Sequence, residues 1–234
     1  MEMKVIDIKG LTFTYPDGRR ALEDIDMEVF KRESLGIIGP NGAGKTTLLF
    51  HLNGILRGRG LVKVLGMNIN NENLKEIRSK IGLVFQDPDS QLFCPTVFED
   101  VAFGPLNLKL SPQEVTRRVS DALEKVGLSG FEERAPYHLS LGEKKKAALA
   151  TVLSMDPQIL LLDEPTSNLD PKARRELIRL LGDLKTTKII AGHDLDLISK
   201  LCRRVILFNR GRKVAYGNTS EILQNEELLR LNGL

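Results

Sequence analysis

Residues 39–46, which read Gly-Pro-Asn-Gly-Ala-Gly-Lys-Thr, fit the phosphate-binding pattern G-x-x-x-x-G-K-[ST]. The apolar residues 34–38 just before this stretch predict a short buried strand, and residues 46–53 just after it predict a helix. This order brings backbone N–H groups and the positive end of a helix dipole close to phosphate oxygens. A chance match in a glycine-rich turn is the alternative, but the flanking strand and helix favour a nucleotide site.

Each residue type in this motif has a chemical reason for its position. The glycines allow a tight turn that brings the backbone against the phosphates. Lys45 can reach the β- and γ-phosphates, and the Thr46 hydroxyl can ligate Mg²⁺. The predicted nucleotide contacts are Gly39, Pro40, Asn41, Gly42, Ala43, Gly44, Lys45, Thr46 and Thr47.

Length and charge limit the classes of protein to which this chain can belong. A chain of 234 residues forms one large domain or one domain with an added lobe, and it can bury a core without disulfides or structural metals. Its net charge of +3 is too small and too evenly spread to indicate a nucleic-acid partner. Cys94 and Cys202 lack metal-ligand or CxxC spacing, which indicates free thiols in a reducing cytosol.

Membrane and export signals are not expected. The N-terminal residues lead directly into a predicted strand, so we expect no secretory signal. The densest apolar run, residues 159–162, is far shorter than a membrane-spanning helix. We therefore expect a soluble chain whose membrane role, if any, comes through a partner.

Alternation of polar and apolar residues predicts a small sheet before the phosphate-binding motif and a larger one after it. Residues 4–15 and 21–30 predict two strands joined by a turn at Pro16-Asp17-Gly18. Further strands are expected at 61–64, 81–85, 159–164, 187–191, 205–208 and 213–216, with helices at 73–80, 171–184, after 194 and from about 220.

The stretch between two of these strands, residues 87–155, predicts mostly helix. Residues 86–95 form an expected loop, followed by a short helix at 96–103 that Gly104-Pro105 is expected to stop. Two capping boxes, Ser111 with Glu114 and Ser140 with Glu143, are expected to open two longer helices. The apolar face of the first is Val115, Val119, Ala122 and Val126.

Two adjacent carboxylates follow the apolar strand 159–162. Asp163 at the strand end would hold Mg²⁺, through water or through Thr46. Glu164 would orient or deprotonate a water that attacks the γ-phosphate. Acidic residues at a strand end are common in isolation, but together with the phosphate-binding motif they predict a nucleoside triphosphatase.

With these motifs in this order, the whole chain resembles the ATP-binding subunit of the ATP-binding cassette (ABC) family. The resemblance implies an α/β P-loop NTPase fold with a parallel core sheet, an N-terminal antiparallel β subdomain and an inserted helical subdomain. We expect a single domain over 1–234, with the core and β subdomain formed by 1–86 and 156–234 and the helical subdomain by 87–155.

The family's motifs assign expected roles to individual positions. Residues 140–143 resemble its signature segment, which closes over the ATP of a second subunit, and residues 167–170 resemble the dimer loop between subunits. By pattern alone Tyr15 is an ordinary strand aromatic, but the resemblance implies that it stacks on adenine. The implied residues are Glu164, His193 and Gln86 for catalysis; Thr46, Gln86 and Asp163 for Mg²⁺; Ser140, Leu141, Gly142 and Glu143 for the signature segment; and Ser167, Asn168, Leu169 and Asp170 for the dimer loop.

The implied mechanism has a second ABC ATPase subunit, identical or different. Two subunits would hold two ATP molecules between them, and closing and reopening would do mechanical work on a partner. The signature segment departs from the family pattern, because Leu141 replaces a glycine and Glu143 a glutamine. We expect the site to function, with the lysines at 144–146 offsetting the added charge; otherwise these lysines form a solvated face or contact a partner or lipid.

Residues 86–110 resemble one branch of the family, the energy-coupling-factor importers and, among them, cobalt and nickel uptake ATPases. This implies a transmembrane coupling subunit, a substrate-capture membrane subunit and a peripheral position on the cytoplasmic face of the cell membrane. Leu92, Phe93 and Phe98 either contact the coupling subunit or pack inside the helical lobe. An importer ATPase for a vitamin and a soluble ABC ATPase not tied to transport are the alternatives.

Overall fold

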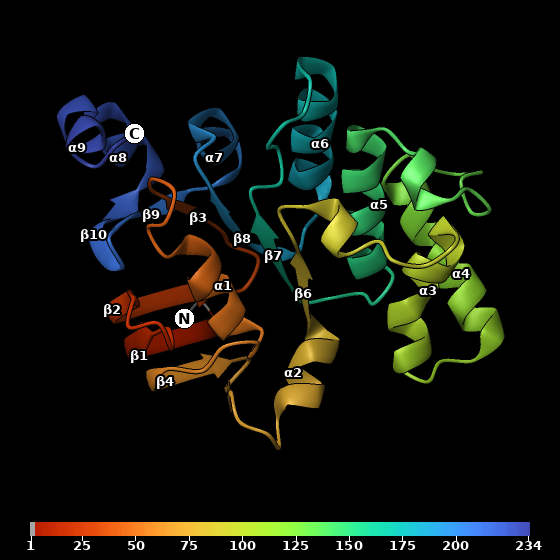
Figure 1. The fold of residues 1–234 in the computed structure, drawn as a ribbon, viewed down its shortest axis with the longest axis horizontal. Helices are drawn as coiled ribbons and strands as arrows, with labels where there is room; N and C mark the ends of the chain where they lie inside the picture. The colour runs from red at the N-terminus through yellow and green to blue at the C-terminus, as the bar shows by residue number, and fades with distance from the viewer. Residues whose placement is uncertain (1–2) are drawn as a thin grey trace.

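Two β-sheets meet around the helix α1 (Lys45–Leu52), which follows the phosphate-binding motif and contacts strands of both sheets (Figure 1). The structure, a computed structural model, describes residues 3–234. The first residues of the chain, on which the expectation about a secretory signal partly rests, lie outside this range. No helix in residues 3–234 combines the length and the apolar character needed to cross a membrane.

The larger sheet has the strand order β10-β9-β3-β8-β7-β6. All neighbouring pairs are parallel except β9 and β10, which form an antiparallel hairpin at one edge. The parallel core sheet is therefore confirmed, with the predicted C-terminal hairpin as its edge. The strands are β3 (Ser34–Ile38), β6 (Ile81–Val84), β7 (Ile159–Asp163), β8 (Thr187–Gly192), β9 (Arg204–Asn209) and β10 (Arg212–Asn218).

The smaller sheet is antiparallel and has the order β2-β1-β4-β5. It consists of β1 (Lys4–Thr14), β2 (Arg20–Phe30), β4 (Arg59–Val64) and β5 (Met67–Asn68). The N-terminal antiparallel subdomain is confirmed, but it is larger than the two strands expected. Strand β4 pairs with β1, which no local pattern predicts, and the two-residue strand β5 is too short to leave a period in the sequence.

The core divides along the two faces of the larger sheet. Ile159 and Leu161 of β7 belong to the cluster that also contains the small sheet and α1, whereas Leu160 and Leu162 belong to the cluster shared with most of the other helices. Because successive side chains of a strand point to opposite faces, a fully apolar run is what a sheet covered on both faces needs.

Three helices between β6 and β7 gather at the β6 end of the sheet (Figure 1). They are α3 (Val97–Asn107), α4 (Pro112–Lys125) and α5 (Leu141–Leu153), and they form the predicted helical insertion. The predicted apolar face of α4 is buried, with Val115, Val119 and Ala122 at most 4% exposed. The exact division of the chain at 87 and 155 stays a prediction.

Helix α3 does not stop at Gly104-Pro105, and that prediction is wrong. Pro105 lies inside the helix and has no N–H to donate to the carbonyl of Val101. The hydroxyl of Ser154, at the end of α5, lies 2.8 Å from that buried oxygen and donates to it instead. A hydrogen bond from a neighbouring helix therefore lets α3 continue to Asn107.

Two smaller expectations also need correction. The Ser111 hydroxyl accepts the N–H of Glu114, but the Glu114 carboxylate turns to Arg117 and Arg118, so that capping box is half formed. The single C-terminal helix expected from about 220 is two helices, α8 (Thr219–Gln224) and α9 (Glu226–Leu231). Asn225 separates them, since its side chain accepts the N–H of Leu228 and starts the second helix.

The remaining elements are short or follow strands of the core. They are α2 (Leu74–Lys80), α6 (Pro171–Asp183), α7 (Leu195–Leu201) and two 3-10 turns, Pro88–Ser90 and Pro136–His138. The first turn lies in the stretch 86–95 that was expected to be an irregular loop. Asp87 accepts the N–H of Asp89 and so gives this stretch a local cap.

Candidate functional site

The phosphate-binding motif occupies the turn from β3 to α1, and two of its glycines are sterically required. Gly39 has a φ of 151°, and a Cβ there would lie 2.2 Å from the carbonyl oxygen of Phe208. Gly44 has a φ of 105°, and a Cβ there would lie 2.4 Å from the carbonyl oxygen of Ala21. Because both obstacles are backbone atoms that cannot move aside, only glycine allows this loop geometry.

Lys45 is buried at the first turn of α1, with only 6% of its surface exposed. Its Nζ donates to the carbonyl oxygens of Gly39, at 2.7 Å, and Pro40, at 3.2 Å. It also lies 3.6 Å from Oε1 of Glu164. The amine is therefore held between the loop backbone and the carboxylate after β7, where it can meet a phosphate bound by the loop.

Glu164 has an unusual backbone that directs its carboxylate into this site. Its φ of 45° lies in the left-handed region, which is strained for a residue with a side chain. The carboxylate accepts from the histidine that follows β8: Nδ1 of His193 lies 2.9 Å from Oε2, and its N–H lies 3.4 Å from the same atom. His193 is 58% exposed at the side chain, so one edge of the dyad is open to solvent.

Asp163 and Thr46 meet beside Lys45 and fit the predicted Mg²⁺ site. Oδ1 of Asp163 is buried without a hydrogen-bond partner. Burial raises the pKa of this carboxyl, and the neighbouring Thr46 side chain lowers it. A divalent cation would compensate the buried oxygen, and Mg²⁺ in phosphate sites usually needs only one or two protein ligands. Residues 3–234 contain no cluster of three or more His, Cys, Asp or Glu suited to a metal ion.

Tyr15 lies at the end of the small sheet, next to α1. Its hydroxyl is 3.0 Å from the Thr47 hydroxyl, so the strand end contacts the first turn of α1 directly. Phe13 packs edge-on against the Tyr15 ring. The guanidinium carbon of Arg19 lies over the Tyr15 ring, 4.9 Å from its centroid. The neighbourhood of Arg19 was not predicted, because it arises only when the turn after β1 folds back.

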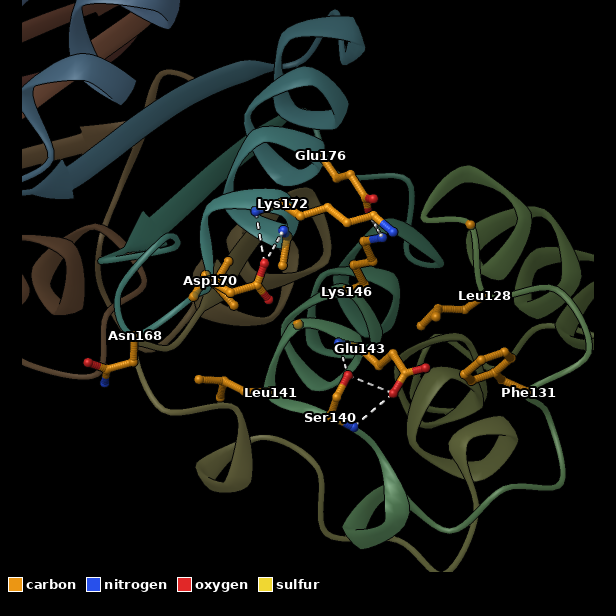
Figure 2. Close-up of a pocket in the computed structure, with 14 residues that line it drawn as sticks. Leu128, Phe131, Ser140, Leu141, Glu143, Lys146, Asn168, Asp170, Lys172 and Glu176 are labelled. Carbon is orange, nitrogen blue, oxygen red and sulfur yellow. Dashed lines mark hydrogen bonds and ion pairs between the residues drawn. The ribbon is translucent and has the colours of Figure 1, made fainter.

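The signature segment lies away from the phosphate-binding motif of the same chain. It lines a cavity of about 490 Å³ together with the dimer loop and the start of α6, and no residue of the motif lines that cavity. Figure 2 shows Ser140 and Leu141 on one side of this space and Asn168 and Asp170 on the other. The structure thus brings the two predicted intersubunit segments together at a cavity that the phosphate-binding motif does not line.

The N-terminus of α5 carries the predicted capping box in full. The backbone N–H and the hydroxyl of Ser140 both donate to Oε2 of Glu143, at 2.8 and 2.7 Å (Figure 2). These hydrogen bonds lower the pKa of Glu143. Gly142 allows α5 to approach α6, since a Cβ there would lie 3.0 Å from that of Ala173. Glu143 therefore occupies the backbone N–H of Ser140 at this helix end.

The lysine run 144–146 is not a solvated face. Lys144 pairs with Asp89 at 2.6 Å and Lys146 with Glu176 at 2.7 Å. Of the three, only Lys146 contributes to lowering the pKa of Glu143, together with Arg134, so the expected charge compensation is partial. Lys145 is buried, and its amine donates to backbone carbonyl oxygens of Gln86 and Glu164.

Gln86 lies two residues after the end of β6, near the start of the helical insertion, and it is exposed at the surface. Its backbone carbonyl accepts from Lys145. The sequence did not predict that Gln91 connects this loop to α5. Gln91 accepts the N–H of Phe85 and donates to the carbonyl of Ala148 in α5. A glutamine within a loop of two prolines has no periodicity that could reveal this.

Comparison with known proteins gives a consistent result. A sequence model of the family described as ABC transporter matches residues 22–167. The chain is 50% identical over 233 residues to the energy-coupling factor transporter ATP-binding protein EcfA of Carboxydothermus hydrogenoformans, an alignment that covers 98% of this chain and 86% of that protein. It is 48% identical over 232 residues to the EcfA protein of Methanothermobacter thermautotrophicus, covering 97% of this chain and 75% of that protein.

Solved structures agree with the sequence comparison. CbiO1 from Clostridium perfringens, described as part of the ABC transporter complex cbiONQ, superposes with a TM-score of 0.86 at 38% identity over 98% of this chain and 94% of that one. The ATP-binding cassette MJ0796, a dimer in a post-hydrolysis state with ADP and Pi, superposes with a TM-score of 0.82 at 27% identity over 92% of this chain and 98% of that one.

Proposed function

Because this chain belongs to the ABC transporter family of ATPases, we propose that it is the ATP-hydrolysing subunit of an importer of the energy-coupling-factor class. The EcfA relatives support the class, and the likeness to CbiO1 supports assembly with membrane subunits. The activity itself, hydrolysis of ATP, follows from the family.

The proposed chemistry uses the groups that meet at the end of β3 and β7. The backbone of residues 39–46 and Lys45 bind the phosphates, and the ring of Tyr15 supports the base. Thr46, Asp163 and Gln86 would hold Mg²⁺, which when bound neutralises phosphate charge. Glu164 takes a proton from, or orients, the attacking water, and His193 fixes the carboxylate through its Nδ1 contact.

The proposed active form has two ATPase subunits, as in the dimeric MJ0796 structure. The reason lies in the separation of the two halves of the site, since the signature segment and the dimer loop face a shared cavity that contains none of residues 39–46. A second subunit would bring its nucleotide to Ser140 and Gly142. In a dimer of identical chains this arrangement occurs twice about a two-fold axis.

One observation carries the link to a membrane partner. Phe93, Phe103 and Leu106, here called the coupling patch, are 65%, 51% and 58% exposed on the helical insertion. Phe93 and Phe103 pack edge-to-face with their centroids 5.2 Å apart, so they form one apolar surface. Leu92 is buried and Phe98 packs against the core, so of the three residues considered above only Phe93 is available to a partner.

We propose that a cytoplasmic helix of a transmembrane coupling subunit docks on this patch, which places the chain on the cytoplasmic face of the membrane. The patch follows the Gln86 loop directly, so its movement can be transmitted to the nucleotide site. A substrate-capture membrane subunit would complete the importer. The resemblance of residues 86–110 to cobalt and nickel uptake ATPases favours these ions as cargo.

Co-purification with the membrane subunits tests the proposal. The double substitution Phe93→Ala and Phe103→Ala should release the chain from membranes while leaving its ATP binding intact. Leu231→Ala is the matched control, because Leu231 is 70% exposed on α9, outside the patch. Retention of the double variant on membranes, or robust ATPase activity with no membrane subunit recovered, would favour a soluble ABC ATPase instead.

Uptake assays separate the cargo alternatives. Cells that carry the complete importer should accumulate cobalt or nickel, and Glu164→Gln should abolish the accumulation. If a vitamin is taken up in their place, the importer class holds and the metal assignment is wrong.

A further inference from the structure

Lys145 lies on α5, five residues after the signature serine, and only 5% of its surface is exposed. Apolar side chains, including Leu149, Leu162 and Leu177, line the small space beside its stem. Burial lowers the pKa of Lys145 to about 8, although nearby carboxylates raise it. An amine in such a place is costly unless it makes specific hydrogen bonds.

The Lys145 amine makes three such bonds, each to a different part of the site. It donates to the carbonyl oxygen of Gln86 at 3.2 Å, to the carbonyl oxygen of Glu164 at 3.1 Å and to the hydroxyl of Ser167 at 3.0 Å. One side chain therefore joins the signature helix to the Gln86 loop, to the catalytic carboxylate residue and to the dimer loop.

Lys145 contacts the backbone carbonyl of Glu164, the residue with the strained left-handed conformation. The carbonyl oxygen of Glu164 accepts from Lys145, from the Ser167 N–H at 3.1 Å and from the Ser167 hydroxyl at 2.9 Å. A left-handed conformation at a residue with a side chain persists only where the surroundings hold it. Lys145 is the one charged donor among these three groups, so it contributes strongly to that support.

We propose that Lys145 is a positioning residue that transmits movement of the signature helix to Glu164 and the dimer loop. The inference rests on the dimer in the proposed function. There, Ser140 at one end of α5 closes over the ATP of the partner, while Glu164 acts on the ATP bound by its own chain. A displacement of α5 carries the Lys145 amine with it and shifts the Glu164 turn, so the two nucleotide sites are coupled within one chain.

Steady-state ATP hydrolysis by the full-length dimer tests this. Lys145→Met should lower kcat about tenfold and bring the Hill coefficient for ATP close to one, with the half-saturating ATP concentration changed less than about twofold. Lys145→Arg, which retains a buried cation and several donors, should restore most of kcat. Lys145→Gln provides a second loss variant if the methionine variant folds poorly.

Lys188→Met is the matched control. Lys188 is also buried, at 5% exposure, and its amine also donates to backbone carbonyls, those of Leu184 and Thr186, but it contacts neither the signature helix nor Glu164. It should lower the melting temperature without lowering kcat. The inference would be overturned by an equal fall in kcat for Lys188→Met or by an unchanged kcat for Lys145→Met. A Lys145→Met variant that changes only the half-saturating ATP concentration would also overturn it.

The test distinguishes this inference from the proposed function. If the wild-type chain forms no ATP-dependent dimer, either with itself or with a second ABC ATPase subunit, the proposed function fails, whatever the Lys145 variants do. If it dimerises and hydrolyses ATP with a Hill coefficient of one, or if the Lys145 variants match it in kcat and cooperativity, only the coupling through Lys145 is refuted.

Discussion

The carboxylate of Glu164 lies between two nitrogen partners: Nδ1 of His193 is 2.9 Å from Oε2, and Nζ of Lys45 is 3.6 Å from Oε1. The amine is buried in the phosphate-binding loop, whereas the imidazole belongs to a surface segment. Both partners are suited to bind phosphate oxygens as well. Binding of a γ-phosphate can therefore draw Lys45 and His193 toward it and leave the carboxylate able to act on a water.

Replacement of this carboxylate should separate binding from hydrolysis. Glu164→Gln keeps the size of the side chain and one acceptor oxygen but removes the base, so turnover should fall by about 10²- to 10⁴-fold. ATP affinity should change little, because Lys45 and the loop backbone remain. Phosphate release and equilibrium binding of ATP measure the two effects. Unchanged turnover would show that Glu164 is not the base.

Chelation of divalent cations should abolish ATP hydrolysis, and Asp163 should determine how much Mg²⁺ the reaction needs. Asp163→Asn removes the charge of the buried, unpartnered Oδ1, so the half-saturating Mg²⁺ concentration should rise about tenfold or more. Asp100→Asn is the control, since Asp100 is equally buried and has an unpartnered Oδ2 but lies in the helical insertion. A similar shift in both variants would argue against a Mg²⁺ ligand at Asp163.

Glu143 should weaken closure of the dimer. Its carboxylate holds the Ser140 hydroxyl and N–H, and a partner's γ-phosphate that approaches Ser140 meets this negative charge. Glu143→Gln retains an oxygen acceptor for Ser140 and removes the repulsion, so ATP-driven dimerisation should strengthen about tenfold.

Sedimentation of the Glu164→Gln chain, with and without the Glu143 change, measures this effect at saturating ATP. Glu176→Gln lines the same cavity but leaves Ser140 untouched, so it is the control for a general change of charge. Equal or weaker dimerisation of the Glu143 variant would show that this carboxylate does not oppose closure.

Local motifs allowed much of the nucleotide site to be predicted from sequence, because each depends on neighbours along the chain. The turn from β3 to α1 and the Ser140–Glu143 capping box are of this kind. What escaped prediction depends on distant residues. Lys145 lies within a run of lysines that suggests a solvated face, yet its acceptors lie 59, 19 and 22 positions away. The continuation of α3 through Pro105 likewise depends on Ser154, 53 positions from Val101.

Asp194 should make the free energy of unfolding depend on pH. Burial would raise its pKa, but hydrogen bonds from Arg174, the N–H of Leu197 and Thr166 lower it to about 2. The unfolded value is about 3.9, so the folded state favours the ionised form; this stabilisation is complete above the unfolded pKa and is lost as pH falls toward 2. We expect a loss of about 2 kcal/mol in the free energy of unfolding across this window.

Denaturant unfolding at several pH values between about 5 and 2 measures this loss. Asp194→Asn should be less stable at pH 5 and should show a flatter pH dependence. Asp196→Asn is the control, because Asp196 also pairs with Arg174 but is largely exposed. A flat profile in the wild-type chain would contradict the assignment.

Ser154 and Pro105 should be energetically coupled. In the wild-type chain, Ser154→Ala leaves the buried carbonyl of Val101 without a donor, which should cost about 1–3 kcal/mol of unfolding free energy. Alanine at position 105 has an N–H that can make the missing helical bond to Val101. In the Pro105→Ala background, the same Ser154→Ala change should therefore cost at least about 1 kcal/mol less.

A double-mutant cycle by chemical denaturation measures this coupling. Ser199→Ala, whose hydroxyl donates only to the carbonyl of Asp196 within its own helix, is the control and should show no coupling to position 105. Independent effects at the two positions, within about 0.5 kcal/mol, would mean that the Ser154 hydroxyl does not replace the bond that Pro105 removes. The helix would then continue through Pro105 because of packing alone.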